Sequence, residues 1–302
     1  MHMPAFSSLA QFFLATKLLG QKRPLLASFK LTYRCNLRCM ACPFHLRSHE
    51  ANAHISWEKA IRSLAELKRQ GCLIVVFEGG EPLLWNDGSH DFPELVAYAK
   101  RGFLCVGATT NGTLTLDVPT DVLWVSIDGP KHSHDMLRSD SFDIVVRNLR
   151  AAKHRKLFVH FRFNHQNWQD FEATVHILSS IPQVKGITVQ FFYPYDQGEA
   201  PLAMDATGRA LAIGKVLELK QKGLLILNST ASLKAMIENT WQCHEWLLAN
   251  VDPGGSVTTG CYAQGRGDVK CAHCGFIPVA EASGAFELRP GSLLAGWRIF
   301  LA

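Results

Sequence analysis

The sequence predicts an α/β protein whose parallel sheet forms a partial (β/α)6 TIM-like barrel, followed by a small cysteine-rich extension. Three observations carry this prediction. The 302 residues exceed a usual single core of about 100 to 200 residues but suit one barrel with an appendage. From residue 27, short β-branched apolar runs alternate with helical apolar patterns, as in successive βα units. This alternation stops near residue 228, before a group of cysteines.

The expected elements follow in chain order. A helical apolar pattern covers 5–20 and ends at Gly20. Strands are expected at 28–33, 73–78, 103–109, 122–127, 156–163 and 186–193. Helices are expected at 56–70, 91–101, 141–154, 168–180 and 205–222, with a short one at 293–300. The expected domains are a helical lead-in over 1–26, the barrel over 27–228, and the cysteine-rich extension with its tail over 229–302.

Composition and charge exclude some classes of function. The chain is 47% hydrophobic and 19% charged, and no run reaches the roughly 20 apolar residues that span a bilayer. The net charge of +5, without a basic block, argues against nucleic acid as a partner. We expect the 5–20 helix to dock on the main domain, and peripheral contact with a membrane surface is the alternative.

Nine cysteines, grouped at ligand spacings without a secretory signal, predict metal binding in a reducing cytoplasm rather than disulfides. Cys72 and Cys105 stand alone in apolar runs and are expected to be buried as small hydrophobic residues.

Three cysteines, Cys35-x3-Cys39-x2-Cys42, directly follow the first expected strand. Three thiolates within eight residues can hold three irons of a cubane cluster, and one iron then stays open to a ligand that is not protein. A catalytic metal keeps such a position free, whereas a structural site is closed. From the spacing alone, a zinc knuckle with a distant fourth ligand or three buried thiols are the alternatives.

Short polar or glycine-rich cassettes follow the next three expected strands. They cover 79–82, 109–113 and 125–130. Gly79 and Gly80 allow close approach of the backbone to a ligand, and Glu81 can accept a hydrogen bond from an ammonium group. Ser126 and Asp128 alternate onto one side of their strand and could hold vicinal hydroxyls. Functional residues of such barrels lie in the loops at the carboxyl ends of the strands.

These cassettes, in this order behind Cys-x3-Cys-x2-Cys, resemble the radical S-adenosylmethionine superfamily over roughly residues 28–193. The resemblance implies that Cys35, Cys39 and Cys42 hold a [4Fe-4S] cluster whose open iron chelates the amino and carboxylate groups of S-adenosylmethionine. It also implies a donor of single electrons, such as flavodoxin or ferredoxin. Reductive cleavage of S-adenosylmethionine then yields a 5'-deoxyadenosyl radical, which takes a hydrogen atom from the substrate.

The resemblance also implies which residues contact S-adenosylmethionine. They are Gly79, Gly80, Glu81, Asn111, Ser126, Asp128 and Arg138. The glycines and Glu81 are expected at the methionine ammonium, and Ser126 and Asp128 at the ribose or carboxylate. Arg138 occupies the place of a carboxylate-binding arginine of relatives, with an exposed charge as the alternative. Relatives carry an aromatic residue before the third cysteine, whereas this chain has Ala41, so that adenine contact is in doubt.

A second set, Cys243-x17-Cys261-x9-Cys271-x2-Cys274, offers four thiolates and therefore a closed site. By itself the spacing favours zinc, because zinc ribbons also end in Cys-x2-Cys. The resemblance instead implies a SPASM- or Twitch-type extension with an auxiliary [4Fe-4S] cluster that transfers electrons. Zinc stays the alternative.

The expected function is hydrogen abstraction from a small or medium-sized substrate. A peptide-modifying maturase is the first alternative, although only 27 residues precede the first expected strand. A lipid-modifying enzyme at the membrane surface is the second alternative, and an iron-sulfur redox sensor is the non-enzyme alternative. The candidates for the proton acceptor are His160, Arg162, Asp196 and Glu199.

Overall fold

The computed structural model describes the chain except residues 1–2, 195–197, 262, 264–270 and 272–275. Its framework is a curved sheet in which eight strands follow the order β6-β5-β4-β3-β2-β1-β7-β8. The first six strands are parallel to their neighbours. They are β1 Leu26–Thr32, β2 Ile74–Gly79, β3 Cys105–Thr110, β4 Val122–Ser126, β5 Leu157–Phe163 and β6 Val184–Phe191. The predicted α/β class and the six expected strands are therefore confirmed.

Two further strands come from the segment after residue 228. β7 (Leu248–Val251) pairs in parallel with the free edge of β1, and β8 (Val257–Thr259) pairs in antiparallel with β7. Asp252 closes the turn between them, since its carbonyl accepts the N–H of Gly255 (2.9 Å) and its carboxylate accepts that of Ser256 (3.0 Å). This hairpin pairs the edge of β1 that an unclosed barrel leaves open.

The helices agree with the expected apolar patterns, with additions. The expected ones are α1 Met3–Phe13, α2 Trp57–Arg69, α3 Phe92–Ala99, α5 Phe142–Ala151, α6 Phe171–Ser179, α7 Ala206–Gln221 and α10 Pro290–Gly296. The structure adds α4 Lys131–Leu137, α8 Thr230–Glu238 and α9 Ile277–Phe286. α1 and α10 both continue into a π turn, at Leu14–Leu18 and Trp297–Leu301.

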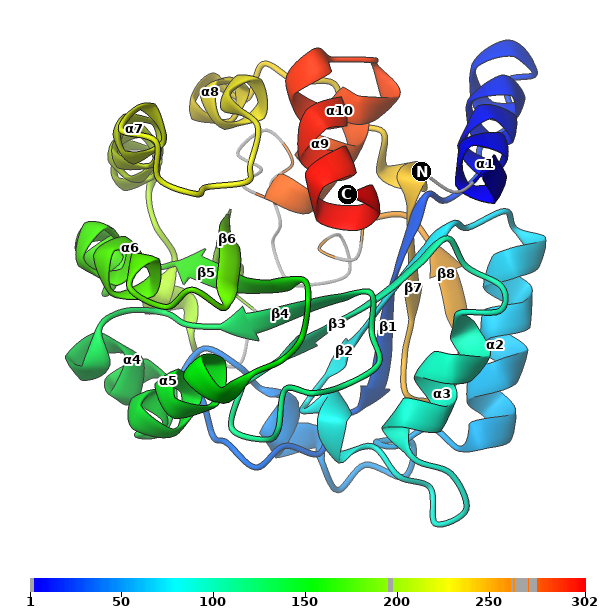
Figure 1. Cartoon of the computed structure of the whole chain (residues 1–302), viewed down its shortest axis with the longest axis horizontal. Coiled ribbons are helices and arrows are strands. Elements are labelled where there is room, and N and C mark those ends of the chain that lie inside the picture. The colour runs from blue at the N-terminus through cyan, green and yellow to red at the C-terminus, as the bar shows by residue number, and fades with distance from the viewer. Residues whose placement is uncertain (1–2, 195–197, 262, 264–270, 272–275) are drawn as a thin grey trace.

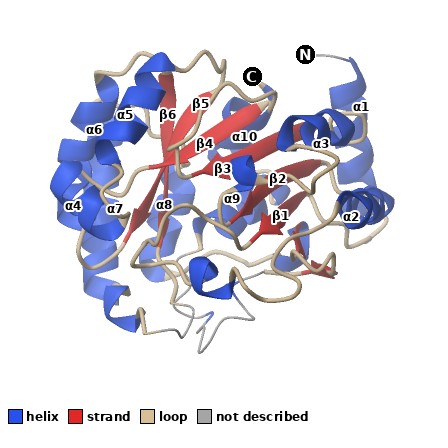
Figure 2. Ribbon diagram, turned by 90° about the horizontal axis from the view of Figure 1, so that it is seen from below, coloured by secondary structure: helices blue, strands red, loops and turns tan. Residues whose placement is uncertain are grey.

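The sheet separates two apolar regions. Figure 2 shows α2 and α3 beside β1 and β2, and α4 to α7 around the other end of the sheet. Alternate strand residues such as Phe29 and Phe77 pack against these helices, in a core that includes Leu64 and Leu95. Trp124 and Phe158 belong to a separate cluster, against which Phe300 at the C-terminal end packs. Ser126 and His160 follow Trp124 and Phe158 by two residues along β4 and β5, and therefore lie nearer the carboxyl ends of these strands.

The N-terminal helix docks through Phe12, which packs against Leu247 and Phe286. Leu18 and Leu19 beyond it are exposed. Figure 1 shows α9 and α10 between α8 and α1 at the top of the view. None of the helices in the described part of the chain is long and apolar enough to cross a membrane, and the alternative of peripheral membrane contact stays a prediction.

Candidate active site

The cysteine loop lies at the carboxyl edge of the sheet, directly after β1. Its backbone is held on both sides: the N–H of Tyr33 donates to the Ala53 carbonyl (2.7 Å), and the N–H of Met40 donates to the Leu137 carbonyl (3.0 Å). The N–H of Arg38 also donates to the hydroxyl of Ser139 (3.0 Å). The loop is therefore packed between its own return segment and the end of α4.

Cys35, Cys39 and Cys42 are free thiols on this loop. Burial, with smaller contributions from the neighbouring Glu81, Cys39 and Cys42, raises the pKa of Cys35 to about 11. The three thiols thus interact electrostatically, and iron binding must displace their protons. In the part of the chain that the structure describes, no three His, Cys, Asp or Glu side chains are placed around a single metal ion. A cubane cluster instead takes each cysteine on a different iron, so this donor set fits it.

Gly79 and Gly80 allow the cysteine loop to lie against the end of β2. Gly79 has a φ of +137°, and a Cβ there would lie 2.4 Å from the Thr32 carbonyl oxygen. At Gly80, a Cβ would lie 2.1 Å from the Arg34 carbonyl oxygen. The N–H of Gly80 instead donates to the Thr32 carbonyl at 2.6 Å. The glycine pair thus permits backbone contact between this cassette and the residues leading to Cys35.

We expect Gly80→Ala to destabilise the chain by about 1–3 kcal/mol and to lower the iron that it binds, because backbone atoms must move to admit the methyl group. Urea unfolding and iron analysis measure both effects. Gly214→Ala in α7 is the control: its Cβ would meet nothing within 4 Å, and replacing a mid-helix glycine by alanine stabilises by roughly 0.5–1 kcal/mol. A Gly80→Ala protein with unchanged stability and iron content would contradict this close approach.

Glu81 links the loops that follow β2 and β3. Its carboxylate is fully buried and accepts three hydrogen bonds, from the N–H groups of Leu83 (3.1 Å) and Asn111 (2.7 Å) and from the hydroxyl of Thr110 (2.8 Å). Burial raises the pKa of Glu81 to about 7, against the lowering effect of these donors. Its described hydrogen bonds all join protein groups, and the expected contact with an ammonium group stays a prediction.

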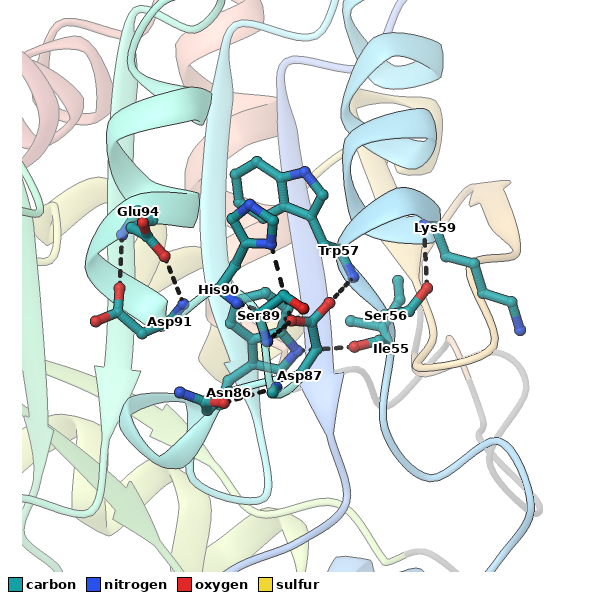
Figure 3. Close-up of polar contacts among 12 residues, drawn as sticks. Ile55, Ser56, Trp57, Lys59, Asn86, Asp87, Ser89, His90, Asp91 and Glu94 are labelled. Carbon is teal, nitrogen blue, oxygen red and sulfur yellow. Dashed lines mark hydrogen bonds and ion pairs between the residues drawn. The ribbon is translucent and has the colours of Figure 1, made fainter.

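The loop that follows β2 is also tied, near Asp87, to the start of α2. Figure 3 shows the Asp87 carboxylate directed at the Trp57 N–H (2.7 Å) and accepting the N–H groups of Ser89 and His90 (3.0 and 2.9 Å). The rings of Trp57 and His90 stack with centroids 4.0 Å apart. His54, at the end of the cysteine loop, lies 3.0 Å from the Asn86 carbonyl oxygen through Nε2. These contacts hold the cysteine loop and the glycine cassette together at both ends.

Asp128 and Arg138 form a buried ion pair beside the cysteine loop. Arg138 Nε donates to Asp128 Oδ2 at 2.6 Å, and the Arg162 N–H donates to Oδ1 at 3.1 Å. The Arg162 guanidinium lies 4.0 Å from Oδ2. Burial alone would raise the pKa of Asp128, but Arg138 and Arg162 hold it below its usual value. Arg138 is only 9% exposed, so the alternative of an exposed charge is wrong.

His134 is a positioning residue that the sequence analysis did not single out. It is fully buried, its Nδ1 accepts the Asp128 N–H (3.3 Å), and its Nε2 lies 3.1 Å from the Ser141 hydroxyl. That hydroxyl donates to the Arg138 carbonyl at 2.7 Å. Burial lowers the pKa of His134 to about 4, so the ring is neutral near pH 7. The neutral ring joins the backbones of Asp128 and Arg138.

The strand register brings together residues far apart in sequence. Ser126 of β4 lies opposite His160 of β5, which lies opposite Thr188 of β6. His160 Nδ1 is 2.9 Å from the Thr188 hydroxyl, and burial lowers the pKa of His160 to about 4. Arg162, two residues further along β5, lies opposite Gln190. His160 and Arg162 therefore point to one face of the sheet, together with Ser126.

The proton-acceptor candidates differ in their surroundings. Arg162 Nε has no hydrogen-bond partner among the described residues, and its guanidinium carbon lies 5.3 Å from the centroid of the Phe192 ring. A guanidinium remains charged in proteins and is therefore a poor base. Glu199 is buried, and Asp196 lies outside the described residues. The identity of the proton acceptor stays a prediction.

The sequence analysis also did not single out a second polar group, which lies on β1 and β2. Lys30 Nζ lies 3.1 Å from the Ser28 hydroxyl and 3.2 Å from Glu78 Oε1, and Ser28 hydrogen-bonds the same carboxylate. Lys30 and Glu78 are register partners on β1 and β2. The Glu78 charge also reaches His160, whose pKa it tends to raise. The alternation of Ser28, Lys30 and Thr32 in an otherwise apolar strand was the available signal in the sequence.

The C-terminal cysteines are described only in part. Cys243 and Cys271 are exposed and Cys261 is half-buried, whereas Cys274 lies outside the described residues. That these four side chains hold an auxiliary cluster or zinc therefore stays a prediction.

Comparisons with known proteins show which family part of this chain resembles. The family model described as "Radical SAM superfamily" matches residues 29–178. Fe-coproporphyrin III synthase of Methanosarcina barkeri is 30% identical over 177 residues, which are 54% of this chain and 43% of that relative. Mycofactocin maturase MftC of Mycobacterium tuberculosis is 32% identical over 146 residues, 44% of this chain and 36% of the relative. The chain thus spans less than half the length of these curated relatives.

Solved structures share the fold at low sequence identity. SuiB of Streptococcus suis bound to S-adenosylmethionine superposes with a TM-score of 0.64 and 15% identity, over 96% of this chain and 69% of that one. Methylornithine synthase (PylB) superposes with a TM-score of 0.53 and 16% identity, over 96% and 89%. The family match and the fold agree, and residues 29–178 of this chain, which include the cysteine loop, match the radical SAM superfamily.

Proposed function

We propose that this protein is a radical enzyme that uses a [4Fe-4S] cluster on Cys35, Cys39 and Cys42 to cleave S-adenosylmethionine reductively. The observation that carries the proposal is the packing of the three-thiol loop against the Gly79-Gly80 backbone on one side and the end of α4 on the other. When bound, the cluster and S-adenosylmethionine supply a 5'-deoxyadenosyl radical that takes a hydrogen atom from the substrate.

The chain's own residues would bind and orient S-adenosylmethionine beside this loop. Gly79 and Gly80 are half-buried, and backbone carbonyls of this cassette would accept hydrogen bonds from the methionine ammonium. Ser126 and Arg138 supply a hydroxyl and a guanidinium for its ribose and carboxylate. Asp128 accepts a bond from Arg138 Nε (2.6 Å) and would act by aiming this guanidinium.

The substrate is proposed to bind on the face of the sheet that carries His160 and Arg162. Arg162 Nε, which has no hydrogen-bond partner among the described residues, supports a substrate with an anionic or other hydrogen-bond-accepting group. Two relatives bear names of porphyrin-type synthases, Fe-coproporphyrin III synthase and pre-heme d1 synthase. A small or medium-sized molecule is therefore the first candidate.

A peptide is the second candidate substrate. The PqqA peptide cyclase of Rhodopseudomonas palustris is 36% identical over 91 residues, 30% of this chain and 23% of that relative. A flavodoxin or ferredoxin is the proposed electron donor, in a reducing cytoplasm that keeps the thiols available. The set Cys243, Cys261, Cys271 and Cys274 is proposed to hold an auxiliary [4Fe-4S] cluster for electron transfer.

Anaerobic reconstitution tests this proposal directly. We expect about eight irons per chain, four for each cluster. With dithionite and S-adenosylmethionine, the loaded protein should release 5'-deoxyadenosine even without substrate. About four irons with one zinc would overturn the auxiliary cluster and leave the rest intact. Fully loaded protein that releases no 5'-deoxyadenosine would overturn the enzyme and favour a redox sensor.

A further inference from the structure

A closed ring of three hydrogen bonds lies beside the first cysteine of the loop. Asn111 Nδ2 donates to Asn36 Oδ1 (2.8 Å), and Asn36 Nδ2 donates to the Thr113 hydroxyl (2.8 Å). The Thr113 hydroxyl donates back to Asn111 Oδ1 (2.7 Å). Asn111 and Thr113 follow β3, whereas Asn36 belongs to the cysteine loop. The ring therefore connects two segments that are more than 70 residues apart in sequence.

This ring fixes which way the Asn111 amide faces. Asn111 Oδ1 accepts both the hydroxyl and the N–H of Thr113, at 2.7 and 2.9 Å. Both are donors, so the oxygen must lie on that side and the nitrogen on the other. Asn111 Nδ2 lies 3.7 Å from Cys35 Sγ, to which it donates its second hydrogen. Only 7% of the Asn111 surface is exposed, which limits competition from water for these hydrogen bonds.

Among the described residues, two groups donate hydrogen bonds to Cys35 Sγ, and Asn111 is one of them. The N–H of Leu37 lies 3.4 Å from the same sulfur. The Leu37 bond is a local turn within the loop, and a substitution of its side chain leaves it in place. The Asn111 bond comes from a side chain on another strand end, so substitution can remove it without changing the backbone that carries the cysteines.

A donor beside a cluster sulfur acts on the reduction potential. Reduction adds one negative charge to the cluster and its thiolates, and a hydrogen bond to a more negative acceptor is stronger. Such bonds are one of the known determinants of iron-sulfur potentials. We propose that Asn111 raises the reduction potential of the cluster that Cys35 ligates, and so makes it easier for the electron donor to reduce. This rests on the proposed function, in that Cys35 must bind an iron-sulfur cluster.

The test compares two variants of the reconstituted full chain by EPR-monitored redox titration. Asn111→Leu keeps the approximate size and removes the donor. We expect its midpoint potential to be more negative, with the ratio of reduced to oxidised cluster at a given potential lowered roughly tenfold, which is about 59 mV for one electron. Thr113→Val opens the same ring but leaves the Thr113 N–H on Asn111 Oδ1. We expect its potential to shift much less.

The two variants distinguish an effect of Asn111 on the reduction potential from a purely structural role. If Asn111 only braces the loop, both variants lose stability and neither changes the potential of the cluster that still forms. An unchanged potential in loaded Asn111→Leu would overturn the proposal, and so would equal shifts in the two variants. Iron content and 5'-deoxyadenosine release of the unmodified chain are measured in parallel. If these are absent, the proposed function fails; if they are present without a potential shift, only this inference fails.

If Asn111→Leu does not bind a cluster, a measurement on the unmodified chain still tests the proposal. Protein labelled with 15N in the asparagine side-chain amide is reduced and examined by pulsed EPR. We expect a hyperfine coupling from one side-chain nitrogen, since Asn111 Nδ2 lies 3.7 Å from Cys35 Sγ. The Leu37 amide carries no label and does not contribute. Absence of this coupling in loaded protein would contradict the proposed bond whatever the variants do.

Discussion

Cys39→Ala is expected to abolish release of 5'-deoxyadenosine and to lower bound iron by about four atoms per chain, because a cubane on two protein thiolates loses a ligand that nothing on the loop replaces. Cys39 is the most buried of the three thiols, and its charge interacts with both Cys42 and Arg138. Iron analysis and quantification of 5'-deoxyadenosine under anaerobic conditions measure the two effects.

Cys72→Ala is the matched control for this substitution. Cys72 is also a buried free thiol, but its Sγ lies against the Ile74 carbonyl at 3.3 Å, away from the loop. We expect the control to lose some stability through the small cavity and to keep its iron and its cleavage of S-adenosylmethionine. Full iron content and activity in Cys39→Ala would show that the loop does not hold the catalytic cluster.

The second large effect is expected at the buried ion pair. Arg138→Met leaves the Asp128 carboxylate with the hydrogen bond from the Arg162 N–H (3.1 Å) and with the Arg162 guanidinium, 4.0 Å away, as its nearest described cation. Removing one partner of a buried pair usually costs about 3–5 kcal/mol of unfolding free energy. Because Arg162 remains, we expect a loss near the lower end, about 3 kcal/mol. Urea unfolding of the chain without metal, near pH 7, measures it.

The sign of the pH dependence follows from the lowered pKa of Asp128. The folded state then binds the proton less readily than the unfolded state. The stabilisation by the ion pair is fully present above the pKa that Asp128 has in the unfolded chain. It is lost as the pH falls through the lower pKa that Asp128 has in the folded chain. As the pH is lowered from 7, the difference in unfolding free energy between the unmodified chain and Arg138→Met should therefore become smaller.

Lys131→Met in α4, the helix that ends directly before Arg138, provides the comparison with an exposed pair. Lys131 is 57% exposed at its side chain and pairs with Asp135 and Asp143 at 2.9 and 2.6 Å. Exposed pairs contribute little to the free energy of unfolding because water screens them. Equal losses in Arg138→Met and Lys131→Met would contradict the assignment of Arg138 to a buried, structurally required pair.

Local patterns in the sequence were sufficient for much of the fold. β-branched apolar runs and helical periodicity depend on neighbours a few residues apart, and the six strands and the helices between them appear near the expected positions. α4 was missed, because Lys131–Leu137 has many polar residues and no apolar stripe. β7 and β8 were not expected in the sheet, because their pairing depends on the free edge of β1, more than 200 residues earlier.

The sequence by itself determined the parallel α/β framework, the cysteine triplet after β1 and the glycine cassette after β2, because spacing along the chain is enough to recognise them. Tertiary structure alone decided which polar groups meet: Ser126 with His160, Lys30 with Glu78, and Asn111 with Cys35. Such pairs join different strands, so they depend on strand register and on how loops pack. Neither is encoded in the distance between residues along the chain.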